Sequence, residues 1–178
     1  MTVFISGGAK CGKSAIAQNL AVKLAAGERL CYVATMIPSG DEDAERIRRH
    51  LQDRDGMGFE TIECFRDILS IADPSATFLV DNITSLIQNA LFPPEKDYRM
   101  DLPGAMNCAR ELVQFARCVR HAVFVSDYIY SDAQRYSEST ERYRKSLADA
   151  DRALAGICDV VMEVCAGIPI IHKGASCL

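Results

Sequence analysis

The 178-residue sequence lacks several patterns that would assign it to a particular class of protein. Its eight cysteines form no Cys-x-x-Cys pair, and its three histidines lie far from any paired cysteine, which excludes the usual zinc-ligand spacings. No apolar run approaches the roughly 20 residues of a membrane-spanning helix. The first residues carry neither the basic nor the apolar segment of a secretory signal. We therefore expect a cytoplasmic protein whose thiols are mostly free and pack as small buried hydrophobic groups.

The sequence also lacks an excess of basic residues. It has 24 acidic and 20 basic residues, a net charge of −4, which argues against a general nucleic-acid binder. Apolar residues make up 49% and charged residues 25%, as in ordinary globular proteins, and this excludes disorder. A chain of this length can bury a core without a disulfide or a structural metal. We expect one domain over residues 1–178.

Apolar segments alternate with helical patterns along the chain. The expected strands are 2–6, 30–34, 59–64, 77–80, 122–125, 159–164 and 168–172. The expected helices are 14–24, 41–52, 66–72, 83–92, 103–119 and 138–155. Short, continuously apolar strands separated by helices indicate an α/β fold, with a mostly parallel sheet covered on both faces. Only 165–167 separate the last two strands, which predicts a terminal β-hairpin.

Residues 7–14 fit the pattern G-x-x-x-x-G-K-[ST], with a strand before it and a helix after it. Glycines let the backbone N–H groups turn inward around a phosphate, and the helix N-terminus adds positive potential. The Lys13 ammonium can reach the β- and γ-phosphates, and the Ser14 hydroxyl can ligate Mg²⁺. The pattern therefore predicts a nucleoside triphosphate site made by Gly7, Gly8, Ala9, Lys10, Cys11, Gly12, Lys13 and Ser14.

Such a loop needs a carboxylate on a neighbouring strand to hold Mg²⁺ through water. Asp81 ends an apolar run and is the favoured candidate, and Asp127, at the end of another strand, is its competitor. Asp81 could instead cap the next helix, a task that Asn82 could also perform. The guanine-reading N-K-x-D pattern of switch GTPases is absent.

A charged segment at 41–52 carries a histidine between two arginines. Arg46 and Arg54 stand four residues before and after His50, so a continuing helix would present Arg–His–Arg on one face. Imidazole can act as a nucleophile, and flanking cations favour its neutral form and bind the phosphate that it attacks. On spacing alone, a solvated surface helix with a bystander histidine is the simpler interpretation.

Several segments together resemble one family, in order over nearly the whole chain. They are the loop GGAKCGKS, YVAT at 32–35, ERIRRH at 45–50, TIEC at 61–64, DNITSLIQNALF at 81–92 and GIP at 167–169. The sequence resembles the bifunctional adenosylcobinamide kinase / adenosylcobinamide-phosphate guanylyltransferase family of cobalamin biosynthesis. The loop pattern is generic, whereas R-I-x-x-H and the block beginning at Asp81 are more specific.

The resemblance implies a RecA-like P-loop fold, a homo-oligomer, Mg²⁺, and GTP and ATP as substrates. It implies phosphorylation of the corrinoid substrate adenosylcobinamide, and then transfer of GMP from GTP through a guanylylated histidine. His50 falls on that histidine and would be catalytic together with Lys13. The nucleotide-contacting positions of the family fall on Ala34, Thr35, Arg54, Glu63 and Asp81.

The chain departs from the family pattern in its C-terminal half. The family's N-E-V-G after a strand is replaced by residues 127–130, Asp-Tyr-Ile-Tyr. In 143–151 the family's Asp, Gly and Asn are all replaced. These changes keep two alternatives open, a P-loop kinase of a small molecule without nucleotidyl transfer, and a non-catalytic nucleotide-binding relative with a regulatory role.

Overall fold

The fold is built on a mostly parallel sheet. The computed structural model describes residues 1–38, 40, 45, 48, 51–52 and 54–177. Within them seven strands form a sheet of order β3-β2-β4-β5-β1-β6-β7. Their bounds are β1 Thr2–Gly7, β2 Leu30–Ala34, β3 Glu60–Glu63, β4 Thr77–Asp81, β5 His121–Asp127, β6 Val160–Cys165 and β7 Ile168–Lys173. All neighbours pair in parallel except β6 and β7, which form the expected antiparallel hairpin.

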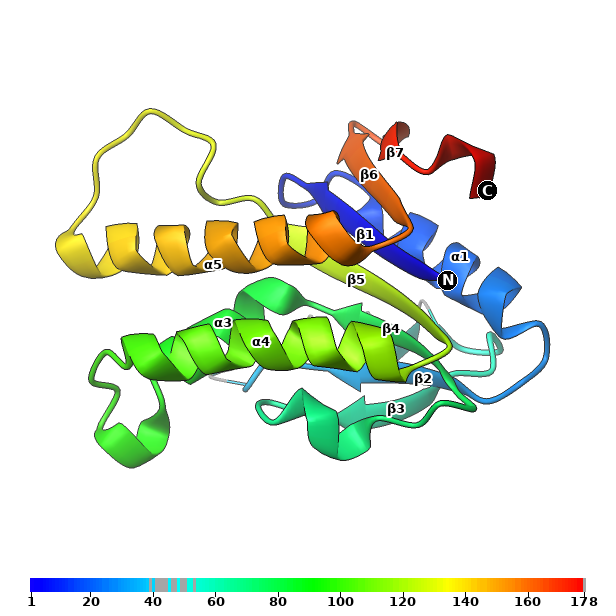
Figure 1. Cartoon of the computed structure of the whole chain (residues 1–178), viewed down its shortest axis with the longest axis horizontal. Helices are drawn as coiled ribbons and strands as arrows, with labels where there is room; N and C mark the ends of the chain where they lie inside the picture. The colour runs from blue at the N-terminus through cyan, green and yellow to red at the C-terminus, as the bar shows by residue number, and fades with distance from the viewer. Residues whose placement is uncertain (39, 41–44, 46–47, 49–50, 53, 178) are drawn as a thin grey trace.

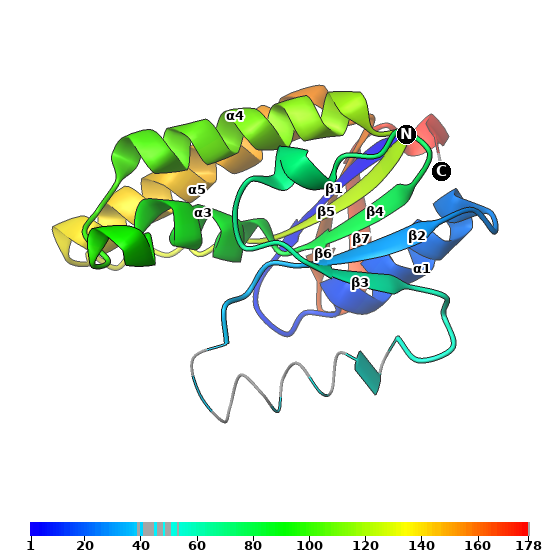
Figure 2. The ribbon, with the colours of Figure 1, turned by 90° about the horizontal axis from the view of Figure 1, so that it is seen from below.

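Helices cover both faces of the sheet, as expected. Helix α1 packs on one face and α3, α4 and α5 pack on the other (Figures 1 and 2). The α-helices are α1 Lys13–Ala25, α3 Ile83–Leu91, α4 Leu102–Cys118 and α5 Glu138–Ile157, and the 3₁₀ helices are η1 Ile68–Ile71, η2 Pro94–Lys96 and η3 Ala175–Cys177. The helix expected at 66–72 is thus a single 3₁₀ turn. Most of the helix expected at 41–52 lies outside the described residues.

Alternation along the strands divides the core into two layers. In β1, Val3 and Ile5 face the layer under α1, whereas Phe4 faces the layer under the other three helices. In that second layer the Phe115 ring makes edge-to-face contacts with Phe78 at 5.1 Å and Phe124 at 6.3 Å between centroids. Strands buried on both faces explain the continuous apolar runs in the sequence.

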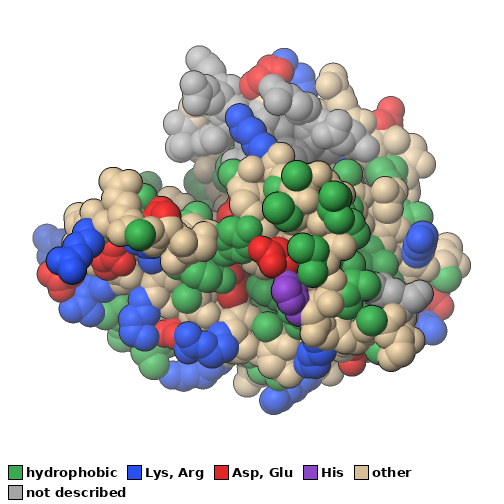
Figure 3. Space-filling view, turned by 90° about the horizontal axis from the view of Figure 1, so that it is seen from above, with side chains coloured by type: hydrophobic (Ala, Val, Ile, Leu, Met, Phe, Trp, Pro, Cys, Tyr) green, Lys and Arg blue, Asp and Glu red, His purple; other side chains and the backbone are tan. Residues whose placement is uncertain are grey.

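The hairpin strand at one end of the sheet is left uncovered. Strand β7 is an edge strand, and Ile168, Ile170 and Ile171 on it are exposed. Figure 3, which looks onto the hairpin side, shows hydrophobic side chains gathered there. None of the helices in the described residues is long and apolar enough to cross a membrane.

The expectation that the thiols are mostly free and buried is confirmed in part. All eight cysteines are free, and four of them, Cys31, Cys64, Cys108 and Cys158, are buried. Cys118, Cys165 and Cys177 are exposed, so the burial expected for them was wrong. They lie where elements end, at the last turn of α4, at the hairpin turn and in the terminal 3₁₀ turn, so no neighbouring layer covers them.

Candidate functional site

The candidate site residues follow parallel strands that end at one edge of the sheet. Strand register places Asp127 beside Gly7, and places both Glu63 and Asp81 beside Ala34. Because parallel strands point the same way, their carboxyl ends bring together residues far apart in sequence. Ligands of such sheets bind at this edge.

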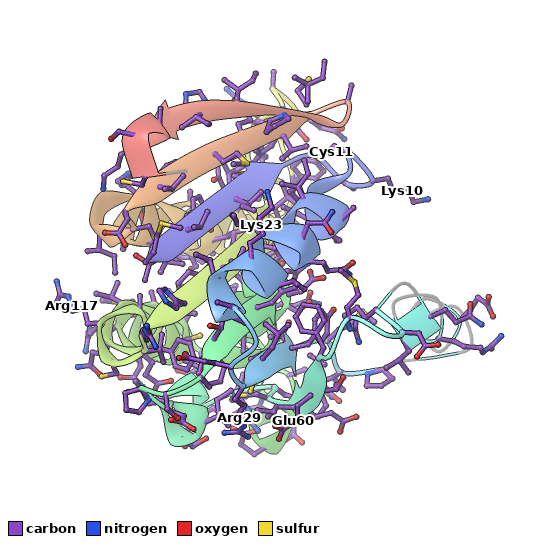
Figure 4. The ribbon with its side chains drawn as sticks, turned by 90° about the vertical axis from the view of Figure 1, so that its right-hand side faces the viewer. Lys10, Cys11, Lys23, Arg29, Glu60 and Arg117 are labelled. Atoms are coloured by element: carbon purple, nitrogen blue, oxygen red, sulfur yellow. The ribbon has the colours of Figure 1, made fainter. Side chains whose placement is uncertain are left out.

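The loop between β1 and α1 is shaped for an anion. Lys10 and Gly12 have positive φ values of 57° and 96°, which turn the backbone around the loop. A Cβ on Gly7 would lie 2.6 Å from the Val164 carbonyl oxygen, so only glycine fits there. Gly12 is the N-cap of α1 and offers no side chain to cap it, so the first N–H groups of the helix stay available for a phosphate. Lys10 projects away from the loop, beyond Cys11 (Figure 4).

The Lys13 side chain is buried inside this loop, with 5% of its surface exposed. Its Nζ donates to the Gly7 and Gly8 carbonyl oxygens at 3.0 and 2.6 Å, and lies 3.7 Å from Cys11 Sγ. It also forms an ion pair with Asp127, 2.8 Å from Oδ1. The loop lysine thus pairs with the carboxylate on β5, next to β1, rather than with Asp81 on β4.

Asp127 links the loop to the ends of the neighbouring strands. Its Oδ2 accepts a hydrogen bond from Asn82 Nδ2 at 3.0 Å, and its backbone N–H donates to Thr84 Oγ1 at 2.9 Å. Asn82 caps α3, since its side chain accepts from the Ser85 N–H at 2.9 Å. The capping role considered for Asp81 therefore belongs to Asn82.

A cavity of about 210 Å³ opens beyond Asn82, at the ends of β2, β3 and β4. Five residues predicted from the sequence line it, namely Ala34, Thr35, Arg54, Glu63 and Asp81. The other lining residues are Tyr32, Met36, Pro38, Leu51, Thr61, Phe65, Asn82 and Ser85. The sequence prediction is therefore spatially coherent, because residues from four separate segments meet around one cavity.

Arg54 is the buried cation of this cavity. Its guanidinium carbon lies 3.4 Å from the centre of the Tyr32 ring, a stacked cation–π contact. Its Nη1 is buried and has no hydrogen-bond partner among the described residues. The Tyr32 hydroxyl, in turn, donates to Asp81 Oδ2 at 3.1 Å. The cavity thus combines a stacked arginine, an available donor and two carboxylates.

Polar residues of the block that begins at Asp81 hold the cavity walls together. Thr35 Oγ1 donates to the Asn82 carbonyl oxygen at 2.8 Å and accepts from the Asn82 N–H at 2.7 Å. Asn89 Nδ2 donates to the carbonyl oxygens of Thr35 and Phe65 at 2.9 and 3.0 Å. For Asn82 only the cap of the helix was considered from the sequence, and the roles of Asn89 and Tyr32 were not predicted, although the D-N-I-T-x-x-x-x-N pattern already contained the two asparagines.

Behind β5 lies a buried carboxyl group, Asp151 of α5. Its Oδ2 accepts from Ser126 Oγ at 2.9 Å and from the Tyr130 hydroxyl at 2.8 Å, while its Oδ1 is buried without a partner. Burial raises the pKa of Asp151 to about 6, and the two hydrogen bonds oppose that rise. Burial also raises the pKa of the Tyr130 hydroxyl.

The nucleophile expected from the sequence, His50, lies outside the described residues, as does Arg46. His172 is exposed on β7, with Nε2 3.0 Å from Glu163 Oε2, and His121 begins β5 with Nδ1 2.9 Å from the terminal amine. No group of three or more His, Cys, Asp or Glu side chains in the described part of the chain could hold a metal. A P-loop Mg²⁺ needs fewer protein ligands than such a group, and the two residues predicted to hold it, Ser14 and Asp81, carry oxygen atoms of the kind that Mg²⁺ binds.

Comparisons with known proteins show the family and the fold of the chain. The family model CobU, described as cobinamide kinase / cobinamide phosphate guanyltransferase, matches residues 3–171. No curated protein matches the chain.

Similar solved structures include a protein from Pyrococcus horikoshii OT3 titled Project ID PH0250, with TM-score 0.52 and 10% identity over 98% of this chain and 86% of that one. A second is FlaH, a flagellar accessory protein from Methanocaldococcus jannaschii, with TM-score 0.49 and 12% identity over 97% of this chain and 77% of that one. A third is the ATPase domain of G40P, with TM-score 0.49 and 12% identity over 91% of this chain and 68% of that one. Sheet order, with β5 between β1 and β4, and the first of these likenesses confirm the expected RecA-like P-loop fold.

Proposed function

Because the chain belongs to the cobinamide kinase / cobinamide phosphate guanyltransferase family, we propose that it catalyses both reactions of that name. It phosphorylates adenosylcobinamide, and it then transfers GMP from GTP to the product to give adenosylcobinamide-GDP. One observation carries the proposal: a P-loop and an arginine-containing cavity lie at the same edge of the sheet, with only β5 between β1 and β4, and are joined through Asp127 and Asn82. Such a site has room for phosphates in the loop and for a further part of a substrate beside it.

In the kinase reaction, the loop N–H groups and Lys13 bind the β- and γ-phosphates of the triphosphate. Ser14 and Asp81 would hold Mg²⁺, partly through water, and a bound ion would offset charge on the transferred group. Lys13 must leave Asp127 to make these contacts, and the phosphate oxygens replace the carboxylate as its partner.

In the guanylyl transfer, His50 is the nucleophile. Its imidazole nitrogen forms a bond to the α-phosphorus of GTP while the bond to pyrophosphate breaks. The phosphate of adenosylcobinamide phosphate then attacks the phosphoramidate and releases His50. Arg54, four residues later in the chain, supports this role, because its buried Nη1 is available to donate to a phosphate oxygen in the cavity.

The test is incubation of the protein with GTP labelled at the α-phosphate. We expect one acid-labile label on the protein, which His50→Ala abolishes. His172→Ala is the matched control, because His172 is an exposed histidine of the hairpin, and its variant should keep the label.

The same experiment separates the alternatives. Phosphorylation of cobinamide without any label would favour the plain kinase. Binding of GTP in a calorimeter, without label and without phosphorylation, would favour a non-catalytic relative.

The family resemblance also supports a homo-oligomer that acts in the cytoplasm. Light scattering of the purified protein at several concentrations tests the first part. A monomer at all concentrations would contradict it.

A further inference from the structure

The ammonium group of Lys13 is fully occupied by acceptors of the chain itself. A lysine has three N–H donors. The Gly7 and Gly8 carbonyl oxygens and Asp127 Oδ1 lie 3.0, 2.6 and 2.8 Å from Nζ, so each donor has its own acceptor. Only 5% of the Lys13 side chain is exposed. A phosphate oxygen can therefore bind Nζ only by displacing one of these acceptors.

Asp127 is the charged acceptor among the three, and it is held in place from two sides. Its Oδ2 accepts from Asn82 Nδ2 at 3.0 Å, and its backbone N–H donates to Thr84 Oγ1 at 2.9 Å. Its backbone also lies beside Gly7 in the register of β5 and β1. The carboxylate therefore cannot follow the lysine or turn to solvent without breaking further contacts.

This fixed carboxylate opposes a bound triphosphate in two ways. An ion pair between groups that are 5% and 22% exposed must be broken, at a cost that water compensates only in part. The freed carboxylate then leaves a negative charge at a loop that has to bind an anion. A neutral side chain would remove both costs, and Asp127 stands where the family pattern has asparagine.

We propose that Asp127 is an internal competitor of the triphosphate, which holds Lys13 in the empty site and lowers the affinity of the loop for phosphates. The inference rests on the phosphate-binding role that the proposed function gives to the loop. It concerns the affinity of the loop and assigns Asp127 no part in the transfer steps. The consequence is a threshold, because the loop fills only at a higher triphosphate concentration than it would with asparagine at this position.

The other carboxyl groups of this region have different surroundings. Asp81 accepts from the Tyr32 hydroxyl and lines the cavity. Asp151 is buried behind β5, where it accepts from the Tyr130 hydroxyl. Asp127 is therefore the carboxylate whose charge must be removed to test the proposal.

The test is calorimetric titration with inorganic tripolyphosphate in the presence of Mg²⁺, a probe without base or sugar that reports on the loop alone. Asp127→Asn keeps the size of the side chain and an oxygen for Asn82 or Lys13, but it loses the charge. We expect its dissociation constant to lie about 10-fold below that of wild type, which corresponds to about 1.4 kcal/mol. Loss of a metal ligand or of a phosphate-binding residue would change the dissociation constant in the opposite direction.

Asp149→Asn is the matched control. Asp149 forms an exposed ion pair with Lys145 on α5, and its substitution changes the net charge of the protein equally. Its dissociation constant should stay within 2-fold of wild type. Asp127→Ser, which is also neutral but smaller, should bind more tightly than wild type as well, and it decides the question if Asp127→Asn does not fold.

Three results would overturn the proposal. One is a folded neutral variant at position 127 whose dissociation constant lies less than 3-fold below that of wild type, or above it. Another is an equal gain of affinity in Asp149→Asn, since the overall charge would then be the cause. The third is no binding of tripolyphosphate to wild type or to any variant.

The proposal about Asp127 and the proposed function can fail separately. A wild-type protein that takes no label from GTP and does not phosphorylate cobinamide fails the proposed function, whereas the tripolyphosphate titration still decides the role of Asp127. An unchanged dissociation constant in Asp127→Asn would refute the internal competitor and leave both reactions untouched.

Discussion

Two buried cations, Lys13 and Arg54, stand at the same edge of the sheet in contrasting environments. Only 5% of Lys13 and 6% of Arg54 is exposed. Lys13 is enclosed by two carbonyl oxygens and the Asp127 carboxylate, so its charge is satisfied within the chain. Arg54 rests on the Tyr32 ring and keeps an unpartnered Nη1 among the described residues.

A buried charge or polar atom without a partner costs free energy, so the two sites differ in what a ligand changes. At the loop, a phosphate must replace an existing ion pair. At the cavity, an anion would satisfy a donor that has no partner. We infer that the loop is organised before binding, whereas the arginine end of the site becomes complete only with its ligand.

Lys13→Ala should produce the largest effect. The variant removes the buried cation of the loop and leaves the Asp127 carboxylate to repel the phosphates. We expect the dissociation constant of a triphosphate to rise on the order of 1,000-fold, which corresponds to about 4 kcal/mol. Calorimetric titration measures it, with Lys23→Ala, an exposed lysine near the end of α1, as the control. A dissociation constant equal to that of wild type would contradict the role given to Lys13 in contrast to Arg54.

Asp151→Asn extends the comparison to a buried carboxyl group with an unpartnered oxygen. The folded-state pKa, about 6, exceeds the ordinary 3.8, so the folded protein binds this proton more tightly than the unfolded chain does. This group's contribution to stability is therefore lost as pH rises from about 4 through about 6, by about 3 kcal/mol in total.

The measurement is urea unfolding of both proteins at several pH values from 4 to 7. Asparagine does not titrate, so the difference in unfolding free energy between the variant and wild type should shift in favour of the variant as pH rises. Asp149→Asn, at an exposed position of the same helix, should preserve the wild-type pH dependence. If the free energy of unfolding of Asp151→Asn depended on pH as that of wild type does, the raised pKa of Asp151 would be contradicted.

Arg54→Ala should weaken the guanylyl transfer more than the kinase reaction. We expect the labelling rate from GTP to fall about 30-fold, or about 2 kcal/mol, because the donor facing the cavity is lost. Arg54→Lys should recover only part of the rate, since lysine keeps the charge without the planar stacking on Tyr32. Arg110→Ala, at an exposed position of α4, is the control. If Arg54→Ala lowered the rates of guanylyl transfer and of the kinase reaction equally, Arg54 would not have a role distinct from that of Lys13.

Asn89→Ala should have the smallest effect, on stability. The variant leaves the carbonyl oxygens of Thr35 and Phe65 without their donor, at a cost of about 1–2 kcal/mol in the free energy of unfolding. Urea denaturation measures this, with Asn107→Ala, an exposed asparagine on α4 that bonds Glu111, as the control. A stability equal to wild type would mean that the cavity walls do not depend on Asn89.

The sequence by itself determined the features that depend on local order. The P-loop is a contiguous pattern between a strand and a helix, and the expected strand 30–34 coincides with β2. Helical periodicity found α1, α3, α4 and α5 to within a few residues. These predictions succeeded because glycine turns and the spacing of apolar residues are determined by residues that lie close together in the sequence. The exposure of Cys165 was not predicted, because it depends on what the rest of the chain leaves uncovered.

Only the tertiary structure decided which distant groups meet. The sequence left Asp81 and Asp127 as competing carboxylates for Mg²⁺, with Asp81 favoured, and could not say which of them meets the loop lysine. The sheet order places β5 between β1 and β4, and this puts Asp127 against Lys13 and leaves Asp81 at the cavity. Strand order follows from how helices on both faces pack onto the sheet, a non-local balance that no short pattern contains. The same packing lays Arg54 over Tyr32.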